Sequence, residues 1–311
     1  MRVEVVEVPE GRLPVRWSPT AVGDYLSCQL KFWFGRVWGW REPTSQALLV
    51  GTIVHGVLED LLALPAADRT LERAVAMLPD RVTREFADEP SAAGRVDPVK
   101  ATELATFSLH AYFGVEDPRE VQVLDDGLER GVTTELGDVA FFGKVDRLAV
   151  AGEMIRLTDY KTGKASPNYM WDKYRQQYLY VAGLRMLGQQ VDEIELLFLG
   201  GEARAVRRPV YAAAVNRALG ELQAAVDGAA SDFAAQNWNT SPGPLCRFCA
   251  FASACPEKRG SVPKPGSAAS EAILVGLGLQ RRSVRQSAAE PTLPDEPDLL
   301  DLVDDDAGGA A

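Results

Sequence analysis

The sequence has 311 residues, 46% of them hydrophobic, which is enough for one large domain or two small ones with a sizeable buried core. No apolar run approaches the roughly 20 residues of a membrane span, and the N-terminus lacks the apolar segment of a signal peptide, so we expect a cytoplasmic protein without a membrane partner. The net charge of −11 argues against nucleic acid, but eight acids and no base lie from Glu290 onward, which leaves −3 for the rest. Charge therefore does not exclude a DNA-binding cleft.

The first third of the chain is predicted to be helical. Ser18 followed by Pro19 is a favourable helix start, and an aromatic-rich segment continues it to about residue 38. Apolar residues recur at helical spacing over 47–63. Two more helices are expected around 69–87 and 98–113.

The middle of the chain changes to strand patterns. Segments rich in β-branched and aromatic residues are separated by glycine-containing breaks, as in antiparallel strands. These segments are 120–124, 131–136, 138–150 and 153–161. A helix at about 168–187, strands at 193–201 and 203–211 and a helix at about 211–236 are expected to follow. This order predicts an α/β or α+β core with a mixed sheet.

The C-terminal part has a different composition. We expect one domain over residues 1–259 and a largely disordered segment over 260–311, apart from a short helix near 269–281, because glycine, serine, proline and acids dominate it. The acidic end is interpreted as a solubilising tail; alternatively it binds a partner or mimics DNA in a basic cleft.

Charged residues near the ends of two predicted strands could form a site. Asp146 lies in an alternating strand, and Asp159 and Lys161 are two residues apart, so they share a face that Tyr160 does not. Two converging carboxylates need a cation between them, and Mg²⁺ or Mn²⁺ prefers oxygen ligands. The alternative is a solvent-facing acid and a surface ion pair that contributes little.

Two predicted helices add polar residues four positions apart. His55 and Glu59 share one face of an otherwise apolar helix, and Gln176 and Tyr180 share a face of another. A buried structural histidine and an ordinary polar helix face are the alternatives to a functional site.

Four motifs follow one another in a recognisable order. They are GTIVH (51–55), GKVDR (143–147), DYKTG (159–163) and QQYLY (176–180). Together they resemble the RecB-type branch of the PD-(D/E)XK nuclease superfamily. The resemblance implies an α/β, restriction-endonuclease-like fold, in which helices flank a central mixed β-sheet.

The resemblance also implies roles for individual residues. His55, Asp146, Asp159 and the main-chain carbonyl of Tyr160 would bind Mg²⁺ or Mn²⁺, and Lys161 would be the catalytic lysine. Gln176 and Tyr180 would position the substrate or the lysine, with Glu59 as a supporting group.

The implied activity is that of a metal-dependent deoxyribonuclease, an exonuclease in DNA repair or recombination acting on single-stranded DNA or DNA ends, with a helicase or another repair protein as partner. A CRISPR-adaptation nuclease that trims spacer precursors is one alternative. A non-catalytic DNA-end-binding scaffold subunit is the other.

The four cysteines form a separate pattern: Cys246, Cys249 and Cys255 are close together, and Cys28 is far upstream. In a cytoplasmic chain such cysteines predict a metal site more than disulfides. The pattern is similar to that of AddB-type and CRISPR-adaptation nucleases, which implies a [4Fe-4S] cluster that staples the C-terminal segment to the first helix. Zinc and free thiols are the alternatives.

Overall fold

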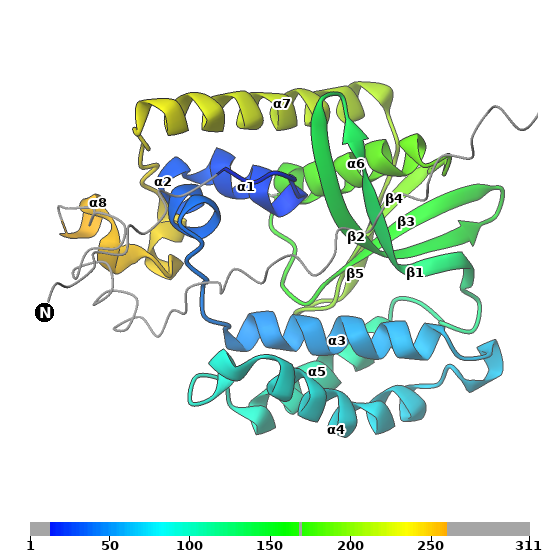
Figure 1. Ribbon diagram of the computed structural model, residues 1–311. Helices are drawn as coiled ribbons and strands as arrows, with labels where there is room; N and C mark the ends of the chain where they lie inside the picture. The colour runs from blue at the N-terminus through cyan, green and yellow to red at the C-terminus, as the bar shows by residue number, and fades with distance from the viewer. Residues whose placement is uncertain (1–12, 168–169, 260–311) are drawn as a thin grey trace, which may run out of the picture.

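The computed structural model describes residues 13–167 and 170–259, and its centre is a mixed five-stranded sheet with helices on both faces (Figure 1). The strands lie in chain order, β1-β2-β3-β4-β5; β3 and β4 are parallel, and the other neighbours are antiparallel. The strands are β1 (Gln122–Leu136), β2 (Val139–Ala151), β3 (Met154–Lys161), β4 (Glu193–Phe198) and β5 (Arg204–Pro209). The predicted mixed sheet flanked by helices is confirmed.

The helices begin where the sequence places capping residues. The Ser18 hydroxyl accepts a hydrogen bond from Ala21 N at 3.2 Å, and Asp97 caps the helix that Pro98 begins. The longer helices are α1 (Pro19–Ser27), α3 (Gln46–Leu62), α4 (Leu71–Asp88), α5 (Pro98–Phe113), α6 (Met170–Met186) and α7 (Ala212–Ala235). Short elements are α2 (Gln29–Phe32), η1 (Trp33–Val37), η2 (Ala66–Asp68), η3 (Pro90–Ala92), η5 (Pro244–Phe248), η6 (Ala252–Ala254) and α8 (Pro256–Arg259).

The prediction of a single helix over residues 18–38 is wrong. Cys28 has an extended backbone, with φ −166° and ψ 112°, and separates α1 from α2. Helix α2 instead contacts the C-terminal segment, because Leu30 N donates a hydrogen bond to the carbonyl oxygen of Asn239 at 3.1 Å. A local sequence pattern does not reveal such a long-range contact.

The two strands expected at 120–124 and 131–136 are one strand, β1. A bulge between Val123 and Leu128 shifts its register against β2. Gly127 lies in the bulge, where a Cβ would be 2.6 Å from the carbonyl oxygen of Leu148. Glu129, just beyond it, has a φ of +45°, so the bulge changes the direction in which β1 presents this carboxylate. The glycine that predicted a break therefore permits a bulge.

Two hydrophobic cores lie on opposite faces of the sheet. One packs α1, α2, α6 and α7 against the sheet, and the other is formed by α3, α4 and α5 (Figure 1). Leu157 of β3 belongs to the first core and Tyr160 to the second, as strand alternation requires. Strand β3 therefore contributes alternate side chains to both layers.

A buried ionic network connects α5 to the sheet. The Arg147 side chain is 1% exposed and donates to both carboxylate oxygens of Glu116, at 2.6 and 2.9 Å. It also donates to Thr158 Oγ1 at 3.0 Å and to Glu195 Oε2 at 3.3 Å. Because a buried guanidinium needs such partners, this network fixes β2, β3 and β4 relative to the end of α5.

The predictions for residues 260–311, namely disorder, a short helix near 269–281 and an acidic tail, concern a segment outside the described residues.

Candidate active site

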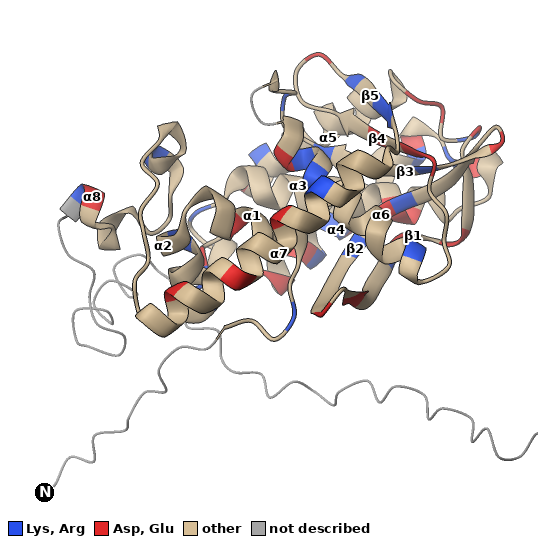
Figure 2. Cartoon of the chain, turned by 90° about the horizontal axis from the view of Figure 1, so that it is seen from above, with Lys and Arg blue, Asp and Glu red and all other residues tan. Residues whose placement is uncertain are grey.

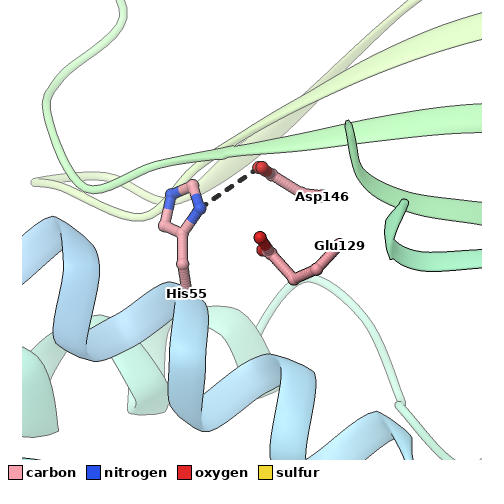
Figure 3. Close-up of side chains that lie close together, drawn as sticks. All are labelled: His55, Glu129 and Asp146. Carbon is pink, nitrogen blue, oxygen red and sulfur yellow. Dashed lines mark ion pairs between the residues drawn. The ribbon is translucent and has the colours of Figure 1, made fainter. Parts of the chain in front are cut away.

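His55 of α3 and Asp146 of β2 point toward each other (Figure 3), and both contact the main chain of Tyr160 in β3. His55 Nδ1 lies 3.3 Å from Asp146 Oδ2, and His55 Nε2 lies 2.9 Å from the carbonyl oxygen of Tyr160. The Tyr160 N–H donates to Asp146 Oδ2 at 2.9 Å. Three of the predicted metal-binding groups, contributed by a helix and two strands, are therefore in direct contact.

The electrostatics of this contact favour an imidazolium beside a carboxylate. Burial works against protonation of His55, but the hydrogen bond and charge of Asp146, with the charge of Asp159, outweigh it and raise the pKa of His55. Burial alone would raise the pKa of Asp146, whereas His55, the Tyr160 N–H and Lys161 lower it. A protonated His55 donates to both oxygens, and a cation bound there would take the place of that proton.

Asp159 and Lys161 share a face of β3, as predicted. Lys161 Nζ lies 2.6 Å from Asp159 Oδ2, and Gln177 Nε2 donates to Asp159 Oδ1 at 2.9 Å. Burial, together with the charge of Asp146, raises the pKa of Asp159 although Lys161 opposes this. Burial lowers the pKa of Lys161, but Asp159 outweighs that and raises it. Lys161 is therefore an ammonium at neutral pH.

Gln176 and Tyr180 share a face of α6, as predicted, and the neighbouring Gln177 adds a contact that was not predicted. Gln176 Nε2 lies 3.4 Å from the Tyr180 hydroxyl, whereas its neighbour Gln177 contacts Asp159. Gln177 is 1% exposed. Sequence reasoning missed it because α6 is buried on most of its circumference and has no clear polar face. Its place directly after Arg175 and Gln176 gave no separate signal.

Glu129 is a site residue that the sequence reasoning did not identify. Ligand atoms of His55, Glu129 and Asp146 all lie within 4.8 Å of one another (Figure 3). Glu129 also forms an ion pair with Lys144. Glu59 lines a cavity together with His55 and Glu129, and burial together with the charge of Glu129 raises the pKa of Glu59. Carboxylates, a carbonyl and one imidazole form a donor set that fits a hard divalent cation such as Mg²⁺ or Mn²⁺.

A cavity of about 470 Å³ opens beside these residues. Its lining includes Gly51 and Thr52 of α3, Lys161 at the end of β3, and Lys173 of α6. Burial and the charge of Lys161 lower the pKa of Lys173. Among residues 13–167 and 170–259, basic and acidic residues are distributed over the elements rather than segregated by sign (Figure 2).

Cys28 lies between α1 and α2, and the other three cysteines lie in the C-terminal segment. Cys28, Cys249 and Cys255 are half-buried and pack against the same hydrophobic core, and none of the four is in a disulfide bond. Cys246 Sγ accepts a hydrogen bond from Gly243 N at 3.3 Å. Phe251 packs against Phe34 with ring centroids 5.5 Å apart, so the C-terminal segment does contact the helical N-terminal part.

This fold, with its His–Asp and Asp–Lys pairs, defines a nuclease class. Residues 16–256 match the PD-(D/E)XK nuclease superfamily, and the chain belongs to that superfamily. The fold is similar to the crystal structure of a protein from Eubacterium rectale described as a "Putative exonuclease", with a TM-score of 0.50 and 14% identity over 75% of this chain and 87% of that one. No curated protein matches the sequence. Within the described residues, no helix is both long and apolar enough to cross a membrane.

Proposed function

We propose that this chain is a divalent-metal-dependent deoxyribonuclease of the RecB type, an exonuclease that hydrolyses single-stranded DNA or DNA ends in repair or recombination. The observation that carries the proposal is the position of the Asp159–Lys161 pair beside the contact between His55, Asp146 and the Tyr160 carbonyl. The superfamily assignment supports a nuclease, and the similar exonuclease-like fold supports action at DNA ends.

Each site residue would have its own role in metal binding or catalysis. His55, Asp146, Asp159 and the Tyr160 carbonyl would hold Mg²⁺ or Mn²⁺, with Glu129 as a further ligand. The cation would supply charge that activates water and neutralises the phosphate. Lys161, held as an ammonium by Asp159, would stabilise the negative charge that develops on the phosphate oxygens. Gln177 would keep Asp159 in place, and Tyr180 with Gln176 would position the lysine or the substrate.

The test is Mn²⁺-dependent cleavage of end-labelled single-stranded DNA. We expect the wild type to cleave, EDTA to abolish cleavage, and Lys161→Ala to reduce the rate by at least about 10²-fold while circular dichroism and thermal unfolding stay close to wild type. Full cleavage by folded Lys161→Ala protein would contradict the assignment. A circular single strand as second substrate separates exonuclease from endonuclease action.

We also propose that Cys28, Cys246, Cys249 and Cys255 hold a [4Fe-4S] cluster that staples the C-terminal segment to α1 and α2. Four free thiols are the number of donors that such a cluster needs, and three of them, Cys28, Cys249 and Cys255, pack against one hydrophobic core. Anaerobic purification should give a brown protein whose iron content is lost in Cys28→Ser. Stoichiometric zinc without iron in the anaerobic wild type would overturn this assignment.

A further inference from the structure

The cations that line the active-site cavity fall into two groups. Arg81 forms ion pairs with Glu85 and Asp60, Lys144 with Glu129, and Lys161 with Asp159. These side chains have protein carboxylates as partners. Their charges are therefore largely neutralised before any substrate arrives.

Lys164 and Lys173 form the second group. Both line the cavity on the side of Lys161, Lys173 from α6 and Lys164 from the loop that follows β3. In the described parts of the chain, 13–167 and 170–259, neither lysine forms an ion pair. The cavity lining thus includes two lysines without an ion-pair partner, in addition to the proposed catalytic lysine.

Lys173 is the more informative of the two because it is half-buried, whereas Lys164 is exposed. An exposed lysine is solvated by water and needs no partner. The half-buried ammonium of Lys173 has lost part of its hydration and is repelled by Lys161; the charges of Asp159 and Asp172 offset this only in part, and no counter-ion lies at ion-pair distance in the described chain. An anion in the cavity would supply that counter-ion.

We propose that Lys173, assisted by Lys164, binds a phosphate of the nucleic acid backbone next to the phosphate that is cleaved. This inference rests on the proposed function for the identity of the substrate. The scissile phosphate would lie at Lys161 and the carboxylate ligands, and the flanking phosphate would lie on the Lys173 side. The occupant is a phosphate mono- or diester, either an internal linkage or a terminal phosphate of the strand.

The test measures binding separately from cleavage. Fluorescence anisotropy in EDTA, where no cleavage is expected, gives the affinity of a labelled single-stranded oligonucleotide for wild type, Lys173→Met and Lys164→Met. Lys100→Met is the matched control, because Lys100 is an exposed lysine of α5 that does not line the cavity. We expect Lys173→Met to weaken binding about tenfold at low salt. The slope of log K against log salt should decrease by about 0.7, the value of one lost phosphate contact on a single strand.

A substrate series identifies the phosphate. Single neutral methylphosphonates are placed at successive positions of the oligonucleotide, and ends with and without a phosphate are compared. A methylphosphonate at one position of the oligonucleotide should weaken its binding to the wild type but should not further weaken its binding to Lys173→Met. If that substitution is internal, the subsite takes a backbone linkage; if only a terminal phosphate matters, it takes the strand end.

Failure of this inference is distinguishable from failure of the proposed function. With Mn²⁺ present, Lys173→Met should raise KM and leave kcat within about twofold, whereas loss of kcat at unchanged KM would overturn the binding role. Affinity and salt slope equal to wild type in Lys173→Met would also overturn it. A wild type that binds but does not cleave DNA would contradict the nuclease assignment while the anisotropy result stands.

Discussion

The ring of Tyr180 lies directly on Gly143: a Cβ at position 143 would be 2.3 Å from Tyr180 Cε1. This contact allows α6 to approach β2 three residues before Asp146. The glycine of the GKVDR motif and the final tyrosine of QQYLY are therefore two halves of one packing contact. Their distance in sequence hides this relationship.

Replacing Gly143 by alanine should displace Tyr180 and destabilise the protein. We expect a loss of about 1–3 kcal/mol in the free energy of unfolding, because the added methyl group overlaps an aromatic ring in a packed interface. Urea unfolding measures the loss, and cleavage assays should show reduced kcat. Gly131→Ala on β1 is the control, since a Cβ there meets nothing within 4 Å. Equal stability of the two variants would contradict the packing argument.

Metal binding should depend on the protonation of His55. The pKa of His55 is raised, and a histidine ligand must be neutral, so Mn²⁺ affinity should rise with pH and each bound ion should release protons. Calorimetry in two buffers with different heats of ionisation counts those protons. His55→Gln should bind more weakly and release fewer protons. The other histidine, His110 of α5, provides a control: His110→Gln should match wild type.

Gln177 should matter more to the metal site than Gln176. Gln177→Leu removes a donor from the Asp159 carboxylate and should raise the Asp159 pKa further above its usual range. Mn²⁺ affinity should therefore fall, and the loss should be larger at pH 6 than at pH 8. Gln176→Leu is the matched variant, and we expect it to change affinity less. An equal pH-independent loss in both variants would contradict a specific role of Gln177.

The buried network of Glu116 and Arg147 should contribute to stability in a pH-dependent way. Burial raises the pKa of Glu116, but Arg147 outweighs this and lowers it. Since the folded pKa is below the unfolded one, the stabilisation is present above the unfolded pKa of about 4.3 and is lost as pH falls through the folded value. Glu116→Gln should cost about 3 kcal/mol at pH 7, because it leaves Arg147 with a weaker set of partners.

Urea unfolding from pH 7 to pH 3 tests the Glu116 prediction. The difference between wild type and Glu116→Gln should shrink below about pH 4. Glu120→Gln is the control, because Glu120 is exposed nearby and should show little difference at any pH. A constant difference between wild type and Glu116→Gln down to pH 3 would assign the effect to packing rather than to charge.

The order of helices and strands could be predicted because each element carries its own periodicity and ends. Alternation along β3 placed Asp159 and Lys161 on one face, and helical spacing placed His55 on α3. What could not be predicted depends on contacts between distant segments. The break at Cys28 is accompanied by a contact between Leu30 and Asn239, and Glu129 follows the bulge of β1 at Gly127. Such positions are set by tertiary packing, which local patterns do not encode.

The two-residue turn between β2 and β3 has a consequence for protein engineering. Ala151 pairs with Met154 across Gly152 and Glu153, and the same register continues to Arg147 and Thr158. Neighbouring residues of β3 face opposite layers. A one-residue deletion within that strand would therefore exchange the faces on which Asp159 and Tyr160 lie. Loop grafts and affinity tags are therefore tolerated at this turn only if the count of strand residues beyond Met154 stays unchanged.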